Sequence, residues 1–356
     1  MSCPHSGDVA SGQVVIAIDP HKASWTAVAV DSRLQPLDAV RVAVGKAGYR
    51  QLRKFARRWP GAIWAIEGAA GLGAPLTARL TEDQITVVDV PAKLARRVRL
   101  LSAGHGRKTD EADALSVGIA AHTATRLHTA QIDEAITALR ALIEHREDLV
   151  RTRTQTINRL HALLTNLVPA GLPRKLTAEA ATTTLRGIRP RTTLGRTLRG
   201  LAMELVAEIR RLDRRITAVA EQISAAVAES GTTLTGLHGI GDLLAAKILA
   251  RTAGVHRFRS AAAFASYCGV APLEASSGDV KRHRLSRAGD RQLNSALHIM
   301  AITQIRRPTE GQAYYQRKRA EGKSHKEALR CLKRRLCDVV YRTMLRDTDT
   351  SLLAAA

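Results

Sequence analysis

The chain has 356 residues, which is enough for two or three domains with hydrophobic cores of their own. Lys and Arg number 55 against 32 Asp and Glu, so the formal net charge is +23. This excess argues against an ordinary metabolic enzyme and for a polyanionic partner, most often nucleic acid. The apolar runs are far shorter than the roughly 18 residues of a membrane span, so no membrane association is expected.

Other features of the composition narrow the class further. Aromatic residues make up only 3% of the chain, so phosphate contacts by Arg and Lys are a better model of binding than base stacking. The four cysteines include no C-x-x-C pair, which predicts free thiols in a reducing cytoplasm and no structural zinc site. Residues 1–12 show no basic start followed by an apolar block, so no secretory signal is expected.

The first third of the chain alternates apolar runs with helical patterns. Short β-branched runs predict strands, and the first three should form an antiparallel meander. The alternation predicts an α/β layer domain over about 14–125. In chain order we expect strands at 14–19, 25–31 and 40–44, a helix at 46–59, a strand at 62–67, a helix at 71–81, a strand at 85–90, a basic helix at 91–101 and a helix at 110–123.

Four acidic residues in this region have informative positions. Asp19 and Glu67 each end a predicted strand, and Asp110 and Asp113 are three residues apart on one predicted helix, so their carboxylates share a face. Carboxylates at neighbouring strand ends, met by such a helix, are suited to hold Mg²⁺ through oxygen ligands. Two such ions can clamp the attacking and leaving oxygens of a phosphoryl transfer. A strand-end acid taken singly is more often a turn residue.

The middle of the chain is predicted to be helical. Apolar residues recur at helical spacing over 132–167, and a second series runs from Leu201 to Val227 in steps of three and four. The second pattern resembles a heptad seam and predicts a coiled coil or a long helical hairpin. Its narrowness and charged flanks favour subunit pairing, and the alternative is two core helices of an ordinary bundle.

The last third of the chain carries two further motifs. Residues 237–249 (LHGIGDLLAAKIL) predict a helix-hairpin-helix element, in which Gly239 and Gly241 let the backbone approach a phosphate; the alternative is a helix cap with a glycine turn. Ser276 and Ser277 precede a glycine and are followed by many basic residues, an arrangement suited to attack on a DNA phosphate, although such a sequence is more often a loop. The candidate nucleic-acid-binding residues are Lys93, Arg96, Arg97, Lys108, Gly239, Gly241, Lys281, Arg282, Arg284, Arg287 and Arg291.

Several of these motifs together resemble a known family. IAIDPHK at 16–22, AIEGA at 65–69 and KTDEADA at 108–114 resemble the DEDD, RuvC-like domain of a large insertion-sequence transposase family. GIGDLLAAKILARTAGVHRF at 239–258, then SYCGVAP, SSG and LSRAGDRQLNSAL at 285–297, resemble the second domain of the same family. The resemblance covers nearly the whole chain, in the same order. Members of this family resemble bridge-RNA-guided recombinases, in which a non-coding RNA of the element pairs with donor and target DNA.

The resemblance implies roles for particular residues. Asp19, Glu67, Asp110 and Asp113 match the metal-binding tetrad, and Ser277, directly before the glycine, matches the nucleophile. The acidic domain of one subunit would meet the serine domain of another, in a homodimer that pairs into a tetramer on two DNAs. Asp290 stands where the family often has Asn, and Asn294 where it often has Arg.

The resemblance also implies the fold and its division. We expect an α/β RNase H-like (RuvC-like) catalytic domain at 1–125, a helical coiled-coil region at 126–230, a mostly α C-terminal domain with the serine at 231–346, and a tail at 347–356. The leading hypothesis is a Mg²⁺-dependent, RNA-guided DNA recombinase with a serine nucleophile in a prokaryotic cytoplasm, associated with the nucleoid. The alternatives are a Holliday-junction-type nuclease that uses only the acids, and a non-enzymatic nucleic-acid-binding protein.

Overall fold

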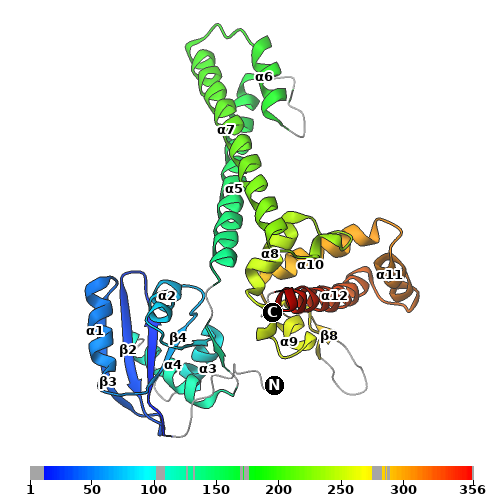
Figure 1. Ribbon diagram of the computed structural model, residues 1–356. Coiled ribbons are helices and arrows are strands. Elements are labelled where there is room, and N and C mark those ends of the chain that lie inside the picture. Colours follow the sequence, from blue (N-terminus) through cyan, green and yellow to red (C-terminus); the bar gives the residue numbers. More distant parts are fainter. Residues whose placement is uncertain are drawn as a thin grey trace. The chain divides into compact units, whose positions relative to one another are not determined.

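The computed structural model divides the chain into two compact units, residues 1–133 and residues 134–356 (Figure 1). The predicted middle region and C-terminal domain therefore lie in one unit. The residues that the structure describes are 12–101, 109–125, 127–130, 133–168, 171, 176–274, 283–284, 286 and 289–354.

The N-terminal unit is built on a six-stranded mixed sheet. Its strand order is β3-β2-β1-β4-β5-β6, with β1, β2 and β3 antiparallel and β1, β4 and β5 parallel. The predicted antiparallel meander is thereby confirmed, and the sheet fits an RNase H-like domain. The strands are β1 (Val15–Pro20), β2 (Ser24–Val30), β3 (Pro36–Ala43), β4 (Ile63–Glu67), β5 (Val87–Val90) and β6 (His128–Thr129).

Helices cover both faces of this sheet because its central strands are apolar on both sides. Along β1, Ile16 and Ile18 pack into one core cluster and Val15 and Ala17 into the other, as the two-residue period of a strand requires. Residues of α1 (Lys46–Ala56) and α2 (Ala74–Glu82) complete the first cluster, and residues of α3 (Ala92–Leu101) and α4 (Asp110–Thr123) complete the second. The unit is thus a three-layer α/β/α domain.

One glycine sets how closely α4 approaches the sheet. A Cβ at Gly118 would lie 3.0 Å from Val30 Cβ and 3.1 Å from Ala17 Cβ, tighter than ordinary van der Waals contact. Gly118 therefore lets the helix that carries Asp110 and Asp113 pack directly on β1 and β2.

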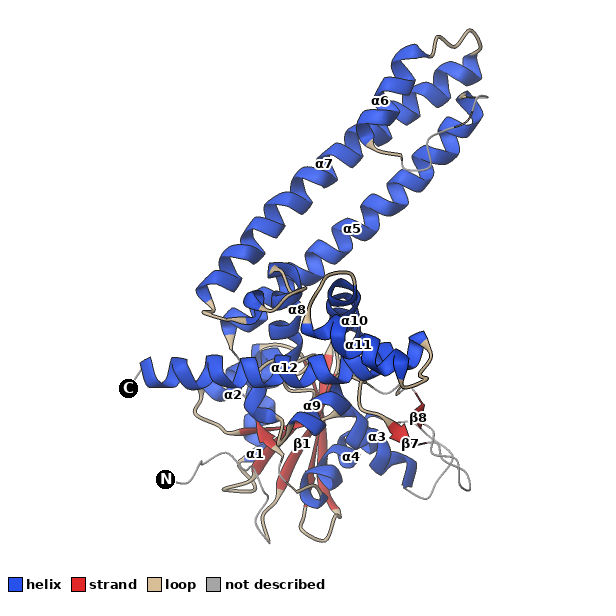
Figure 2. Cartoon of the chain, turned by 90° about the vertical axis from the view of Figure 1, so that its right-hand side faces the viewer, coloured by secondary structure: helices blue, strands red, loops and turns tan. Residues whose placement is uncertain are grey.

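The C-terminal unit begins with a long antiparallel helical hairpin. Helices α5 (Glu134–Leu167) and α7 (Thr193–Glu229) run side by side in both views, with α6 (Ala178–Gly187) near their far ends (Figures 1 and 2). The sequence analysis did not predict α6; its N-cap Thr177 accepts a hydrogen bond from the Ala180 N–H.

The heptad-like seam of α7 packs inside this unit. Ile209, Leu212 and Ile223 are at most 2% exposed and belong to the unit's own core clusters, whereas Leu201 at the start of the seam is 45% exposed. The interpretation of the seam as a contact between subunits is therefore wrong for its buried positions. The same 3.5-residue period is also found where two antiparallel helices of one chain pack together.

The base of the hairpin shares a core with the helices that follow it in the chain. One apolar cluster joins Leu139 of α5 and Val227 of α7 to residues of the following helices, up to Met344. These helices are α8 (Asp242–Thr252), α9 (Ala261–Tyr267), α10 (Arg291–Ile305), α11 (Glu310–Ala320) and α12 (His325–Ala354), with 3₁₀ turns at Leu234–Gly236 and Val255–Arg257. Two short strands outside this core, β7 (Leu273–Glu274) and β8 (His283–Arg284), pair with each other.

Three of the four cysteines lie among the described residues. Cys268, Cys331 and Cys337 are free thiols, and Cys3 lies outside the described residues. Across the described ranges, no helix is both long and apolar enough to cross a membrane.

A matched pair of glycine substitutions tests the close packing of α4. Gly118→Ala should destabilise the protein by about 1–3 kcal/mol, because the methyl group must displace Val30 or Ala17. Gly200→Ala, inside α7 with no atom within 4 Å of the new Cβ, should instead stabilise it by up to about 1 kcal/mol through helix propensity. Urea unfolding followed by circular dichroism measures both. Stabilisation by both substitutions would contradict the packing argument.

Candidate functional site

Two of the predicted acids end neighbouring parallel strands. Asp19 is the fifth residue of β1 and Glu67 the last residue of β4, and the two strands are paired up to Ile18 and Ile66. The next residue on each strand is the acid, so both carboxylates emerge at the same edge of the sheet. The carboxyl ends of parallel strands are where open α/β sheets place their functional residues.

The other two acids come from the first turn of α4. Thr109 is the N-cap, and its hydroxyl accepts a hydrogen bond from the Ala112 N–H at 3.2 Å. Asp110 and Asp113 follow in the first turn, where the positive end of the helix dipole favours negative charge. Asp113 is 5% exposed and Asp19 is 7% exposed.

The electrostatics show that the structure brings the four acids together. Burial raises the pKa of Asp19, and the nearby carboxylates of Asp113 and Asp110 raise it further, against the opposing effect of His21. Burial also raises the pKa of Glu67, with further contributions from Asp19 and Asp113. Each strand-end carboxylate therefore lies within electrostatic reach of Asp113, as the sequence analysis predicted.

Three basic side chains that the sequence analysis did not assign to this site offset the negative charge. His21 Nε2 lies 3.1 Å from Asp19 Oδ2 and 3.4 Å from Asp110 Oδ1. Arg41 Nη1 of β3 lies 3.1 Å from Asp110 Oδ2, and Arg99 of α3 forms an ion pair with Asp113. His21 stood in the IAIDPHK motif and Arg99 in the basic helix, so both were visible; the pairing of β3 with β2 brings Arg41 here.

The donor set fits a hard divalent cation. Asp19, Glu67, Asp110 and Asp113 offer carboxylate oxygens, the ligands that Mg²⁺ prefers. The Nε2 atom of His21 is buried. Although two carboxylates lie near this atom, it has no hydrogen-bond partner among the described residues. A cation among these groups would offset the burial and the repulsion that raise the pKa of Asp19 and Glu67. Within the described ranges, no three His, Cys, Asp or Glu side chains are already arranged to hold an ion. His21, Arg41 and Arg99 instead form ion pairs with the acids.

The predicted serine site falls on residues that the structure does not describe. Ser276 and Ser277 lie outside the described residues, as do Lys108, Lys281, Arg282 and Arg287. The flanking strands β7 and β8 are described, and they pair Leu273 with Arg284 and Glu274 with His283. The eight residues 275–282, which include both serines, therefore connect two paired strands.

The remaining candidate nucleic-acid-binding residues are placed by the structure. Lys93, Arg96 and Arg97 are exposed on α3, and Arg284 and Arg291 are exposed in the C-terminal unit. Gly241 is the N-cap of α8.

Gly239 has a structural reason for being glycine. Its φ of +90° is unfavourable for other residues, and a Cβ would lie 3.1 Å from the Met300 carbonyl oxygen of α10. The sequence analysis expected the backbone at Gly239 to approach a phosphate, but this role is not needed to explain why the residue is glycine.

The two departures from the family pattern also have local roles. Asp290 is the N-cap of α10, and its carboxylate accepts hydrogen bonds from the N–H groups of Gln292 and Leu293, both at 2.9 Å. The Asn294 amide donates to the carbonyl oxygens of Cys268 and Gly269, and its Oδ1 accepts a bond from Lys333 Nζ at 2.6 Å. Asn294 thus joins the turn before β7 to α12.

Comparison with known proteins extends these observations. A family described as "Transposase", of the DEDD type of IS110, matches residues 16–169, and the "Transposase IS116/IS110/IS902 family" matches residues 231–316. A 44.8 kDa protein of insertion element IS116 from Streptomyces clavuligerus is 29% identical, over 94% of this chain and 95% of its own. A 43.6 kDa protein of insertion element IS110 from Streptomyces coelicolor is also 29% identical, over 83% of this chain and 84% of its own.

A solved structure is similar to part of the chain. The Thermus thermophilus RuvC structure in complex with a Holliday junction substrate has 16% sequence identity and a TM-score of 0.25, and the match covers 30% of this chain and 91% of that one.

The mixed sheet, the clustered carboxylates and the two family matches define a DNA-cleaving or recombining enzyme. The chain belongs to the IS110/IS116 family of insertion-element transposases. The DEDD match runs from the N-terminal unit through α5 of the C-terminal unit, and the match to the second transposase domain lies within the C-terminal unit.

Substitution of Glu67 tests the cation site. In metal-free protein, Glu67→Gln should raise the melting temperature, because folding no longer places a charged carboxylate where burial and Asp19 oppose it. This gain should shrink as the pH falls through the raised pKa of Glu67, since the wild-type carboxyl is then protonated as well. Added Mg²⁺ should stabilise the wild type by binding the folded state, and Glu67→Gln should lose most of that stabilisation. Thermal unfolding with and without Mg²⁺ measures each effect.

Asp38→Asn is the matched control for this experiment. Asp38 is a carboxylate of the same unit whose pKa is held below its usual range by the Ala39 N–H and by Arg58. Asp38→Asn should therefore keep the full response to Mg²⁺ and should not stabilise the metal-free protein. An equal Mg²⁺ response in wild type and Glu67→Gln would show that Glu67 is not part of the cation site.

Proposed function

We propose that this transposase is a Mg²⁺-dependent, RNA-guided DNA recombinase that exchanges strands through a covalent phosphoserine link between Ser277 and DNA. The observation that carries the proposal is the assembly of Asp19, Glu67, Asp110 and Asp113 from two strands and a helix at one edge of the sheet. The match to both transposase domains supports a second, serine-bearing part of the same active site.

The chemistry assigned to Ser277 is a transesterification. Its hydroxyl loses a proton, its oxygen forms a bond to the DNA phosphorus, and one P–O ester bond breaks to release a strand with a free hydroxyl end. That hydroxyl end, or the equivalent end of the other DNA, then attacks the phosphoserine and restores Ser277. No phosphodiester bond energy is lost to water, so strands can be exchanged without another energy source.

The acidic residues act on the phosphoryl group. They would hold Mg²⁺, which when bound would neutralise charge on the phosphoryl oxygens and the leaving oxygen. Asp110 and Asp113 are fixed by the capped first turn of α4, and Asp19 and Glu67 by the paired strands. His21 lies beside both Asp19 and Asp110, so it would hold these two carboxylates in position relative to each other.

The partners in this proposal are donor DNA, target DNA and a guide RNA of the element. The net charge of +23 supports binding of several nucleic-acid strands at once. The exposed Lys93, Arg96 and Arg97 of α3 offer one such surface on the acidic-site unit. Two copies of the chain would complete each active site, the acids coming from one copy and Ser277 from the other, and two such dimers would form a tetramer.

A second candidate function is a metal-dependent nuclease of the Holliday-junction type. It is favoured by one observation: the four acids come from the N-terminal unit alone, so that unit could hydrolyse a phosphodiester without Ser277. Hydrolysis leaves no bond between protein and DNA, which separates the two functions experimentally.

Covalent trapping tests the proposal. Wild-type protein with the element's non-coding RNA, labelled donor and target DNA and Mg²⁺ should form a protein–DNA adduct that survives denaturing electrophoresis. Ser277→Ala should abolish the adduct, because the bonding oxygen is removed. Asp19→Asn should lower its rate by at least about a hundredfold, because charge stabilisation at the phosphoryl group is lost.

Ser276→Ala is the matched control, one residue away with the same side chain, and should keep the adduct. Cleavage without an adduct, insensitive to Ser277→Ala and abolished by Asp19→Asn, would establish the nuclease instead. DNA binding with neither cleavage nor adduct would mean that the chain is a non-enzymatic nucleic-acid-binding protein.

A further inference from the structure

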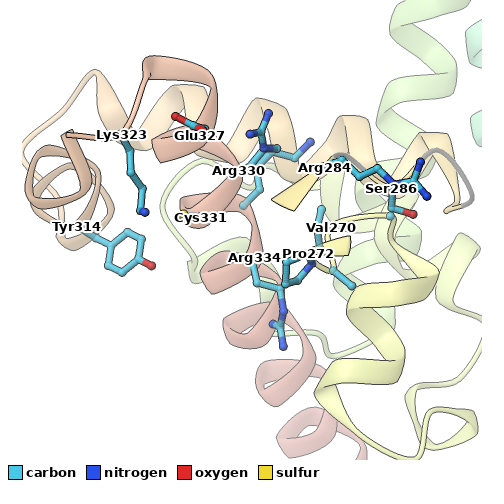
Figure 3. A pocket seen from close by; sticks show the side chains of 13 residues that line it. Val270, Pro272, Arg284, Ser286, Tyr314, Lys323, Glu327, Arg330, Cys331 and Arg334 are labelled. Atoms are coloured by element: carbon cyan, nitrogen blue, oxygen red, sulfur yellow. The ribbon is translucent and has the colours of Figure 1, made fainter. Parts of the chain in front are cut away.

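The C-terminal unit contains a pocket of about 410 Å³ that the catalytic steps proposed above do not use. Its walls come from the turn at 269–272, from β8 and the residue two after it, and from α11 and α12 (Figure 3). Figure 3 shows Tyr314, Lys323 and Glu327 on one side, Arg284 and Ser286 on the other, and Arg330, Cys331 and Arg334 of α12 between them. The volume lies in the range of small-ligand sites.

The pocket concentrates positive charge. Among the described residues that line it, one side chain is acidic, Glu327. Its carboxylate already accepts hydrogen bonds from the Ser324 N–H at 2.9 Å and the Ser324 hydroxyl at 2.7 Å, as a capping box at the start of α12. The basic side chains that line the pocket are Arg284, Lys323, Arg330, Lys333 and Arg334. Arg334 forms an ion pair with Asp338, outside the pocket, so the local excess of positive charge remains large.

Lys333 is the buried member of this group. It is 8% exposed, and burial lowers its pKa because no described carboxylate compensates its charge. Its hydrogen bond goes to the neutral Oδ1 of Asn294, whose own amide is fixed by the carbonyl oxygens of Cys268 and Gly269. Asn294 therefore holds Lys333 at the pocket wall without neutralising it. A buried ammonium group in this state is stabilised by an anion that enters the pocket.

The rest of the lining is apolar and suits the remainder of a nucleotide. Val270, Ala271 and Pro272 form one wall, and the Tyr314 ring forms another. A ligand with an anionic end and a flat or apolar end matches these two parts, whereas an inorganic anion alone would leave the apolar walls in contact with water.

We propose that this pocket binds one nucleotide unit of a nucleic-acid strand, with its phosphate held by Lys333, Arg330 and Arg284 and its sugar or base against Pro272 and Tyr314. The inference deepens the proposed function, because it gives the C-terminal domain a specific grip on the backbone of a strand. The position is also suitable for that role, since Arg284 belongs to β8, the strand that follows the segment with Ser277. The shared chemistry is a sugar phosphate, and the strand can be DNA or RNA.

Equilibrium binding of short fluorescein-labelled oligothymidylate and oligouridylate to the full-length protein tests the site. Arg330→Gln and Arg284→Gln should each weaken binding about tenfold, the value of one charge-assisted hydrogen bond. Each should also lower the slope of log affinity against log salt concentration by about 0.7, as expected for one lost phosphate contact of a single strand. If the substitutions weaken the binding of only the DNA probe or only the RNA probe, the affected probe identifies which kind of strand occupies the pocket.

Arg335→Gln is the matched control, since Arg335 is an exposed neighbour on α12 that does not line the pocket. It should change affinity much less than Arg330→Gln. Equal effects of all three substitutions would overturn the pocket and indicate diffuse electrostatic binding.

A native cysteine gives a second measurement that does not depend on any variant. Cys331 is partly exposed at the pocket wall, whereas Cys268 and Cys337 are buried. Bound oligonucleotide should slow alkylation of Cys331 by iodoacetamide at least several-fold, as read by mass spectrometry of its peptide. An unchanged rate at saturating oligonucleotide would overturn the proposal.

These readouts separate this inference from the proposed function. If Ser277 forms the adduct but Cys331 is not protected and Arg330→Gln binds like Arg335→Gln, the pocket is wrong and the recombinase stands. If no adduct forms in the wild type but both pocket readouts hold, the pocket stands and the serine chemistry is wrong.

Discussion

The repulsion among four carboxylates at one edge of a sheet is the constraint on which the N-terminal unit depends. Asp19 and Asp113 are almost fully buried, where like charges interact strongly and solvation is lost. The fold offsets this cost with the N-terminus of α4, with His21 between Asp19 and Asp110, and with Arg41 and Arg99. A site in which buried carboxylates already attract these positive groups is suited to a divalent cation.

The C-terminal unit shows the opposite imbalance. Around its pocket the basic side chains exceed the acidic ones, and Lys333 is buried beside a neutral amide. The acidic site is suited to a cation and the pocket to an anion, and phosphoryl transfer between nucleic-acid strands requires both. The two units follow the same physical logic, because each holds a local excess of one charge that a ligand of opposite charge would reduce.

The helical hairpin shows how one pattern can serve two kinds of contact. The seam of α7 has the spacing of a coiled coil, and most of it is buried against the chain's own helices. Periodicity reports which face of a helix is apolar, but not which helix covers that face. Any pairing of subunits must therefore use other surfaces than the buried part of this seam.

Local patterns in the sequence determined much of this protein. The β-branched runs gave strands β1 to β5 near their expected places, and the i, i+3 spacing put Asp110 and Asp113 on the first turn of α4. Helix α6 was missed because its threonines and the prolines before and after it are typical of a connection, and tertiary packing on α7 outweighs that propensity. Only the tertiary structure could bring Arg41 and Arg99 to the acids, or Arg284, Arg330 and Lys333 to one pocket. Such contacts join residues far apart in the chain, and spacing along the sequence carries no record of them.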